Sequence, residues 1–168
     1  MASSASPSRA MTMLDRTDRE ILALLQADCT VSMADLAEAV HLGTTACWRR
    51  VQKLQDSGVI RRRVALLDAR LLNVGLTVFV TVRAAQHSAA WTAGFQAAMA
   101  AIEEVVDVHR VSGDSDYLLR VVVPDMQSLE RFIVDHLAKI PGVAKIRSSF
   151  ALKQVRYKTA LPLHDGLR

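Results

Sequence analysis

The spacing of hydrophobic residues in this chain changes near residue 75, and this change limits the folds that the sequence can adopt. Before it, apolar residues recur every three or four positions, as they do on one face of an α-helix. After it, segments in which apolar and polar residues alternate are interleaved with segments of helical spacing. The sequence therefore predicts two domains, with residues 13–63 helical and 75–157 mixed. The remaining predicted segments are a disordered leader, a strand and hinge, and a tail, at 1–12, 64–74 and 158–168.

Six segments follow one another in the mixed domain. Strands are expected at 76–83, 105–111, 117–123 and 143–155, and helices at 88–102 and from 124 to about 140. In the second helix the residues expected to face inward are Met126, Leu129, Phe132, Ile133 and Leu137. The order β-α-β-β-α-β is that of a ferredoxin-like α+β domain, in which two helices cover one face of a four-stranded antiparallel sheet. The other face, which carries Phe79, predicts a homodimer built by stacking two sheets.

Three helices are expected in the first domain. Thr17 and Glu20 have the spacing of a capping box at the start of the first helix, and Ile21, Leu24 and Leu25 form its buried stripe. Ser32 begins a short second helix, and Gly43 permits a tight turn before a third helix. That third helix runs from Thr44 to about Ser57, and its buried residues are Cys47, Val51 and Leu54. A strand is expected after it, from Val59 to Leu67.

The outward face of the third helix suits a DNA major groove. A step of about 100° per residue places Thr45, Arg49, Gln52 and Asp56 opposite the buried stripe. Arg pairs with guanine edges, Gln pairs with adenine, and Lys53 beside them suits phosphate. The segment from Gly43 to Arg63 contains six cations and one anion. Its net charge of +5 therefore exceeds the net charge of +4 of the whole chain. The candidate DNA-binding residues are Ser32, Thr44, Thr45, Trp48, Arg49, Gln52, Lys53, Arg61, Arg62 and Arg63.

Three alternatives to this interpretation stay open. Short capped helices joined by a turn also occur in bundles that never bind nucleic acid, and charge runs such as Arg61 to Arg63 are usually solvated faces. Trp48 lies beside the packing stripe, so it suits partly buried core as well as a base contact.

Composition narrows the class of protein. The apolar content of 51% favours packed cores, and no apolar run reaches the ~18 residues of a membrane span. Cys29 and Cys47 show neither a disulfide pattern nor a metal-ligand spacing, so we expect a cytoplasmic protein without a metal. The five histidines are scattered and no glycine motif cradles phosphate, so we expect no catalytic residues. An enzyme on a ferredoxin-like fold remains the alternative of a different class.

Motifs in both halves of the chain resemble the Lrp/AsnC, or feast/famine, transcriptional regulators. They are Leu14 to Asp18, Thr45 to Val51, Val64 to Asp68, Ser112 to Leu119 and Ser148 to Phe150. The resemblance spans about Leu14 to Leu163. It implies a winged helix-turn-helix followed by a RAM or ACT-like domain, dimers that bind double-stranded DNA and assemble into octamers or similar rings, and amino-acid effectors bound between dimers.

The resemblance also suggests a branch of the family. A Cys-Trp pair in the third helix and a tail from Thr159 to Pro162 are similar to members that respond to cysteine, and nearby members respond to leucine or methionine. Gly43 replaces a frequent capping Ser, while Thr44 and Ala46 replace two prolines, so the chain departs from the family pattern at the start of the third helix.

The turn from Ser112 to Asp116 suits a free amino acid, because a zwitterion needs an anion for its ammonium and amides for its carboxylate. The candidate effector-binding residues are Ser112, Gly113, Asp114, Asp116, Tyr117, Ser148, Ser149 and Phe150. Gly-Asp pairs are also ordinary in hairpin turns, and Tyr117 suits core as well as a pocket wall. An architectural DNA-binding protein that needs no ligand is the second functional alternative.

Overall fold

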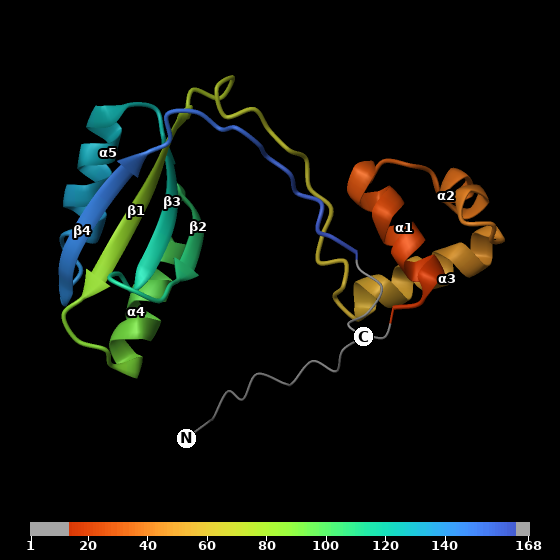
Figure 1. Cartoon of the computed structure of the whole chain (residues 1–168), viewed down its shortest axis with the longest axis horizontal. Helices are drawn as coiled ribbons and strands as arrows, with labels where there is room; N and C mark the ends of the chain where they lie inside the picture. The colour runs from red at the N-terminus through yellow and green to blue at the C-terminus, as the bar shows by residue number, and fades with distance from the viewer. Residues whose placement is uncertain (1–13, 164–168) are drawn as a thin grey trace. The chain divides into compact units, whose positions relative to one another are not determined.

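The computed structural model describes residues 14–163, so the predicted leader and the end of the predicted tail lie outside the described residues. The chain divides into two compact units (Figure 1). One comprises the described residues up to Ala65 together with those from Arg156 onward, and the other comprises Leu66–Val155. The chain thus leaves the first unit and returns to it at the end. No helix in the described part of the chain is long and apolar enough to span a bilayer.

The first unit contains three helices, α1 (Arg16–Ala27), α2 (Met33–Ala39) and α3 (Thr44–Asp56). The stripe predicted for α3 is confirmed, because Cys47, Val51 and Leu54 are all buried against residues of α1 and α2. On α1 the stripe is only partly as predicted. Leu22 is buried beside Ile21, whereas Leu24 is 37% exposed.

The helix starts depend on side-chain caps. The predicted cap at Thr17 is wrong, because the capping box of α1 uses Asp15 as N-cap and Asp18 three residues later. The predicted cap of α2 at Ser32 is confirmed, and its hydroxyl accepts from the Asp35 amide at 3.1 Å. Before α3 the left-handed residue is His41 (φ 54°), not Gly43, whose φ of −67° any residue adopts.

The strand predicted from Val59 to Leu67 does not form in the described chain. From Arg61 to Leu67 no backbone group donates to or accepts from another described residue. A strand needs a partner for its amides and carbonyls. The β-branched residues near Val59 therefore give extended backbone without a ladder.

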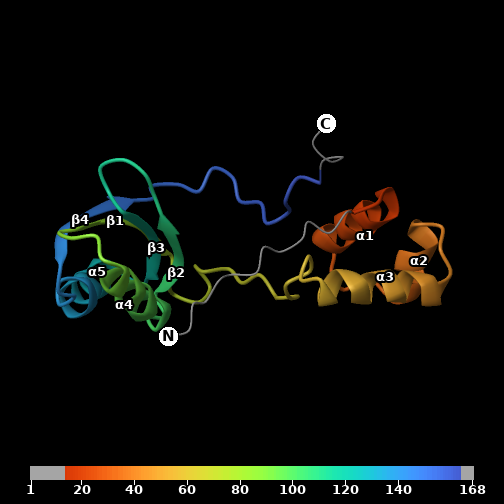
Figure 2. The ribbon, with the colours of Figure 1, turned by 90° about the horizontal axis from the view of Figure 1, so that it is seen from below.

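The second unit is a four-stranded antiparallel sheet, as predicted, and its strands lie in the order β2-β3-β1-β4. Its strands are β1 (Leu76–Ala84), β2 (Val105–Arg110), β3 (Tyr117–Val123) and β4 (Val143–Phe150). The helices are α4 (Ala89–Ala100) and α5 (Met126–Phe132), and a π-helical turn, η1 (Ile133–Leu137), continues α5. Figure 2 shows both helices on one side of the curved sheet. We call the other side the open face.

The core of this unit lies between the sheet and the helices. Residues at alternate positions of β1 and β3 are buried there against Phe95 and Met99 of α4. The π turn keeps Phe132 and Leu137 on the buried side although they are five residues apart, and its Ala138 amide donates to the Ile133 carbonyl at 2.8 Å. Met126, predicted to face inward, is 57% exposed, because it is the first residue of α5.

Candidate DNA-reading helix and effector site

The face of α3 opposite the core carries a group of exposed polar side chains. Thr45, Arg49 and Lys53 are exposed, and Trp48 is 50% exposed, so its ring lies outside the core of this unit. Gln52 is half-buried and donates its amide to Gln55 Oε1 at 3.0 Å. Thr45, Arg49 and Lys53 follow one another at intervals of four residues, which places them along one side of a rod that can enter a major groove. Trp48 and Gln52, also four residues apart, lie directly beside them.

The other predicted DNA contacts lie at the start of α2 and beside α3. Ser32 is exposed, but its hydroxyl already bonds to Asp35 as the helix cap. Thr44 is exposed as the first residue of α3. Arg61, Arg62 and Arg63 are also exposed, on the extended segment that follows the helix. The structure therefore brings Thr44, Thr45, Trp48, Arg49, Gln52 and Lys53 together on one helix and places the others on neighbouring segments.

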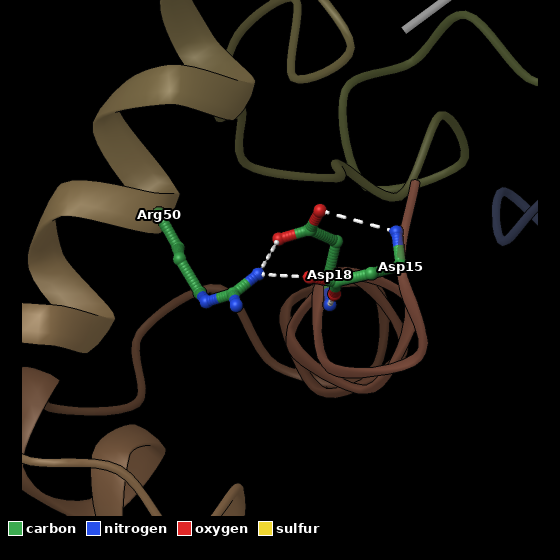
Figure 3. A network of polar contacts seen from close by, with 3 residues as sticks. All are labelled: Asp15, Asp18 and Arg50. Atoms are coloured by element: carbon green, nitrogen blue, oxygen red, sulfur yellow. Dashed lines mark hydrogen bonds and ion pairs between the residues drawn. The ribbon is translucent and has the colours of Figure 1, made fainter. Parts of the chain in front are cut away.

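Arg50 differs from the other cations of α3 because it forms ion pairs within the protein (Figure 3). Its Nη1 donates to Asp15 Oδ2 at 2.6 Å and to Asp18 Oδ1 at 2.8 Å, so one guanidinium bridges both members of the α1 capping box. The side chain of Asp18 is only 7% exposed. Arg50 thus joins α3 to the start of α1 and is already neutralised. From the sequence, Arg50 is only one of the six cations between Gly43 and Arg63, although the Asp-x-x-Asp spacing of the capping box was visible.

This network and the helix core shift three pKa values. The Asp18 amide, followed by the Arg50 guanidinium, holds the pKa of Asp15 below its ordinary value. The carboxylates of Asp15 and Asp18 raise the pKa of Arg50, so Arg50 remains charged. Burial raises the pKa of the Cys47 thiol, which keeps this cysteine protonated within the helix core.

The residues of the turn between β2 and β3 differ in how accessible they are to a ligand. Ser112, Gly113 and Asp114 are exposed, and Gly113 has a φ of +111°, which L side chains rarely adopt. Asp116 instead holds strands together. Its Oδ2 accepts from the Ala84 amide at 2.8 Å, and its Oδ1 lies 3.6 Å from His87 Nδ1.

The sheet separates the remaining predicted effector residues. Tyr117 is 2% exposed and packs its ring on Phe95 at 4.5 Å between centroids, so it is part of the core. Ser148 pairs with buried Val80, whereas Ser149 pairs with Phe79 on the open face. Phe150, at the end of the edge strand, is 42% exposed. The eight residues therefore do not converge on one cavity.

A polar pocket of about 250 Å³ lies beside the β2–β3 turn on the open face. It is lined by Thr81, Arg83, Asp114, Ser115, Lys145 and Arg147. Only Asp114 was predicted from the sequence. The alternation of Arg83 with buried residues of β1 could have identified it as an open-face residue, but its neighbour on β4 depends on the strand order. Within residues 14–163 no three His, Cys, Asp or Glu side chains are grouped as a metal site requires.

Comparison with known proteins assigns both halves of the chain. Residues 77–161 match the Lrp/AsnC ligand binding domain, and residues 14–61 match a winged helix-turn-helix DNA-binding domain. The DNA-binding transcriptional activator DecR of Escherichia coli K12 is 44% identical over 151 residues, which cover 90% of this chain and 99% of that protein. The leucine-responsive regulatory protein of Salmonella typhimurium is 36% identical over 148 residues, with 88% and 90% covered.

Solved structures of related regulators have the same fold as this chain. An AsnC family transcriptional regulator of Agrobacterium tumefaciens has a TM-score of 0.84 at 50% identity, covering 89% of this chain and 97% of that one. A transcriptional regulator of Neisseria meningitidis in complex with L-methionine has a TM-score of 0.84 at 34% identity, covering 89% and 96%. The three-helix unit, the sheet order β2-β3-β1-β4 and these matches identify the family. This chain belongs to the Lrp/AsnC family, and it is a DNA-binding transcriptional regulator with an amino-acid-binding domain.

Proposed function

We propose that this regulator acts in the cytoplasm on genes of amino-acid metabolism, and that cysteine, leucine or methionine changes its DNA affinity or its assembly. The observation that supports sequence-specific reading is the exposed polar face of α3. There Arg49 and Lys53 lie one helical turn apart, and neither forms an ion pair with another residue of 14–163. Cations that are free in the unbound protein are available to guanine edges and phosphates.

A pair of substitutions on α3 tests the DNA-reading part of this proposal. Arg49→Ala removes a base-reading group, so it should cost about 1–3 kcal/mol on the preferred site and flatten the preference between sites. Lys53→Ala removes a phosphate contact, so it should weaken binding to all sequences alike and reduce the salt slope by about one. Mobility shifts on the chain's own upstream region and on a scrambled duplex measure both. Equal loss on both duplexes for Arg49→Ala would contradict its base-reading role.

The effector part is supported by two relatives and by the exposed turn. One relative is named for its response to leucine, and another was crystallised with L-methionine. The cysteine candidate is supported by the Cys47-Trp48 pair in α3 and by the tail. Asp114 is exposed and accessible to a ligand ammonium.

Mobility shifts with increasing cysteine, leucine and methionine test this part. We expect one of them to change operator affinity in the wild type and to lose this effect in Asp114→Ala, while DNA binding without ligand is unchanged. A normal response in Asp114→Ala would contradict the role of Asp114. No response of the wild type to any amino acid would favour the ligand-independent architectural alternative.

We also propose that the open face of the sheet binds a second copy of the chain, and that the resulting dimers assemble into an octamer or a similar ring. Phe79 lies there with 39% of its surface exposed, and Leu118 and Val122 of β3 lie near it on the same face. An exposed aromatic residue with half-buried aliphatic neighbours at the centre of a sheet is typical of a self-complementary interface. Phe79→Glu should therefore reduce the mass measured by light scattering. An unchanged mass would contradict this interface.

A further inference from the structure

Two glutamines of α3 are joined by a hydrogen bond beside its outward face. Gln52 Nε2 donates to Gln55 Oε1 at 3.0 Å, and both side chains are half-buried. Gln52 is one of the candidate base contacts, whereas Gln55 has no role in the site described above. Neither side-chain amide forms another hydrogen bond with a residue of 14–163. Gln55 is therefore the one partner of the Gln52 amide in the described part of the chain.

The direction of this hydrogen bond determines which atoms Gln52 presents to a ligand. A glutamine amide carries two N–H donors and one carbonyl oxygen. Gln55 Oε1 occupies one of the donors, so Gln52 keeps one N–H and its carbonyl oxygen for another partner. The major-groove edge of adenine requires one donor at its N7 and one acceptor at its N6 amine. The hydrogen bond thus leaves Gln52 complementary to adenine.

We infer that Gln55 is a positioning residue, which orients the Gln52 amide for adenine and so contributes to DNA sequence preference without contacting a base itself. This inference rests on the proposed base reading by α3. An unpaired glutamine rotates about its side-chain bonds, and its amide can turn over and exchange donor for acceptor. A side chain that is already oriented in the unbound protein loses less conformational entropy when it binds. The Gln55 carbonyl supplies that orientation.

Three substitutions at position 55 distinguish orientation of Gln52 from simple packing. Gln55→Glu keeps an acceptor and has no donor when ionised, so it should retain the observed direction of the Gln52 amide. Gln55→Lys has donors only, so it should attract the Gln52 carbonyl oxygen and turn the amide over. Gln55→Met has no strong donor or acceptor and should leave the amide unoriented. All four residue types have similar helix propensities, so α3 should form in each variant.

The test is selection of the preferred site of the full chain from a randomised duplex pool, followed by competition between duplexes that differ at one base pair. The informative base pair is the one at which Gln52→Ala removes an adenine preference of about tenfold, equivalent to ~1.4 kcal/mol. There Gln55→Met should lower the preference about two- to tenfold, as expected for the loss of one orienting hydrogen bond. Gln55→Lys should lower it at least as much, and Gln55→Glu should keep it.

The comparison of two duplexes removes the effect of charge on overall affinity. A new charge at position 55 changes the attraction to phosphates equally for both duplexes, so it leaves their ratio unchanged. Asp56→Asn is the matched control, because Asp56 lies one helical turn from Gln52, is exposed and forms no hydrogen bond with it. It should keep the wild-type ratio.

Three outcomes would overturn the inference. The first is an unchanged adenine preference in Gln55→Met and Gln55→Lys. The second is an equal loss in Gln55→Glu and Gln55→Met, because packing rather than the acceptor would then be responsible. The third is a wild-type profile for Gln52→Ala while Arg49→Ala loses a base preference, which leaves the proposed reading by α3 standing. If both alanine variants keep the wild-type profile, the proposed base reading fails together with this inference.

Discussion

Arg49 and Arg50 are neighbours on α3 with opposite surroundings. Arg50 is held between two carboxylates, one of them on the buried residue Asp18, whereas Arg49 is exposed. Removing Arg50 leaves Asp18 as a buried charge with no cation, and that state costs more than the lost ion pair itself. Arg50→Met should therefore lower the free energy of unfolding by ~2 kcal/mol, measured with urea on the full chain.

Arg49→Met is the matched control for this prediction. It removes the same group from the neighbouring position of the same helix. Surface substitutions of this kind usually change the free energy of unfolding by no more than ~0.5 kcal/mol. The two variants should separate stability from DNA recognition, with Arg50→Met unstable and Arg49→Met impaired in binding. Equal unfolding midpoints for both would show that the Arg50 network contributes nothing to the fold.

Asp15 gives the first unit a stability that depends on pH. Its pKa is lowered in the folded chain, first by the Asp18 amide and then by Arg50, so the unfolded chain binds its proton more readily. The contribution is complete above the ordinary value of 3.8 and is lost as the pH falls through the lower folded pKa. Stability should thus fall below about pH 4, and Asp15→Asn should flatten this dependence. Asp56→Asn, on the exposed side of α3, should leave the slope as it is in the wild type.

At the scale of the elements, the turn before β4 depends on a close contact. Gly142 has a φ of +83°, and a Cβ there would lie 2.8 Å from Nε1 of Trp91, which donates to the Pro141 carbonyl at 2.6 Å. Gly142→Ala combines backbone strain with loss of that hydrogen bond, so it should cost ~2–3 kcal/mol in urea unfolding. Gly113→Ala, which has a positive φ but open space around it, should cost only ~1 kcal/mol. Similar losses in both variants would show that the Trp91 contact is unimportant.

The elements with a regular hydrophobic period were predictable from the sequence. Alternation along β1 identified that strand, the turn from Ser112 to Asp116 identified β3 as the second strand of a hairpin, and the i, i+4, i+7 spacing of Cys47, Val51 and Leu54 identified the inner side of α3. The strand predicted after α3 failed because β-branched residues indicate extended backbone without supplying a partner. The π turn was invisible, because a five-residue spacing of buried side chains matches neither the helical nor the strand period.

The candidate sites were predictable only where one element builds them. The outward face of α3 follows from a single helix, so its residues could be inferred from spacing alone. The polar pocket joins β1 and β4, which are far apart in sequence, so its cations are brought together by strand pairing. Tyr117 follows the turn directly in sequence, yet the strand period directs it into the core.

At the scale of the whole molecule, the end of the chain returns to the DNA-binding unit. The Leu161 amide donates to Gln26 Oε1 at 2.6 Å, and Gln26 Nε2 donates to the Leu161 carbonyl at 3.1 Å. Leu163 packs beside the core of the three helices. The sequence predicts only a separate tail at 158–168, because an irregular segment has no period that reveals its partner.

This return predicts that the tail stabilises the helices that bind DNA. Gln26→Ala removes both hydrogen bonds to Leu161 at once, each worth ~0.5–1.5 kcal/mol, so it should lower the free energy of unfolding by ~1–2 kcal/mol. A chain that ends at Thr159 loses the same bonds and the packing of Leu163, so it should lose at least as much. Gln96→Ala, on the exposed side of α4 in the other unit, is the control. Equal stability of Gln26→Ala and Gln96→Ala would show that the tail contact adds no stability to the DNA-binding unit.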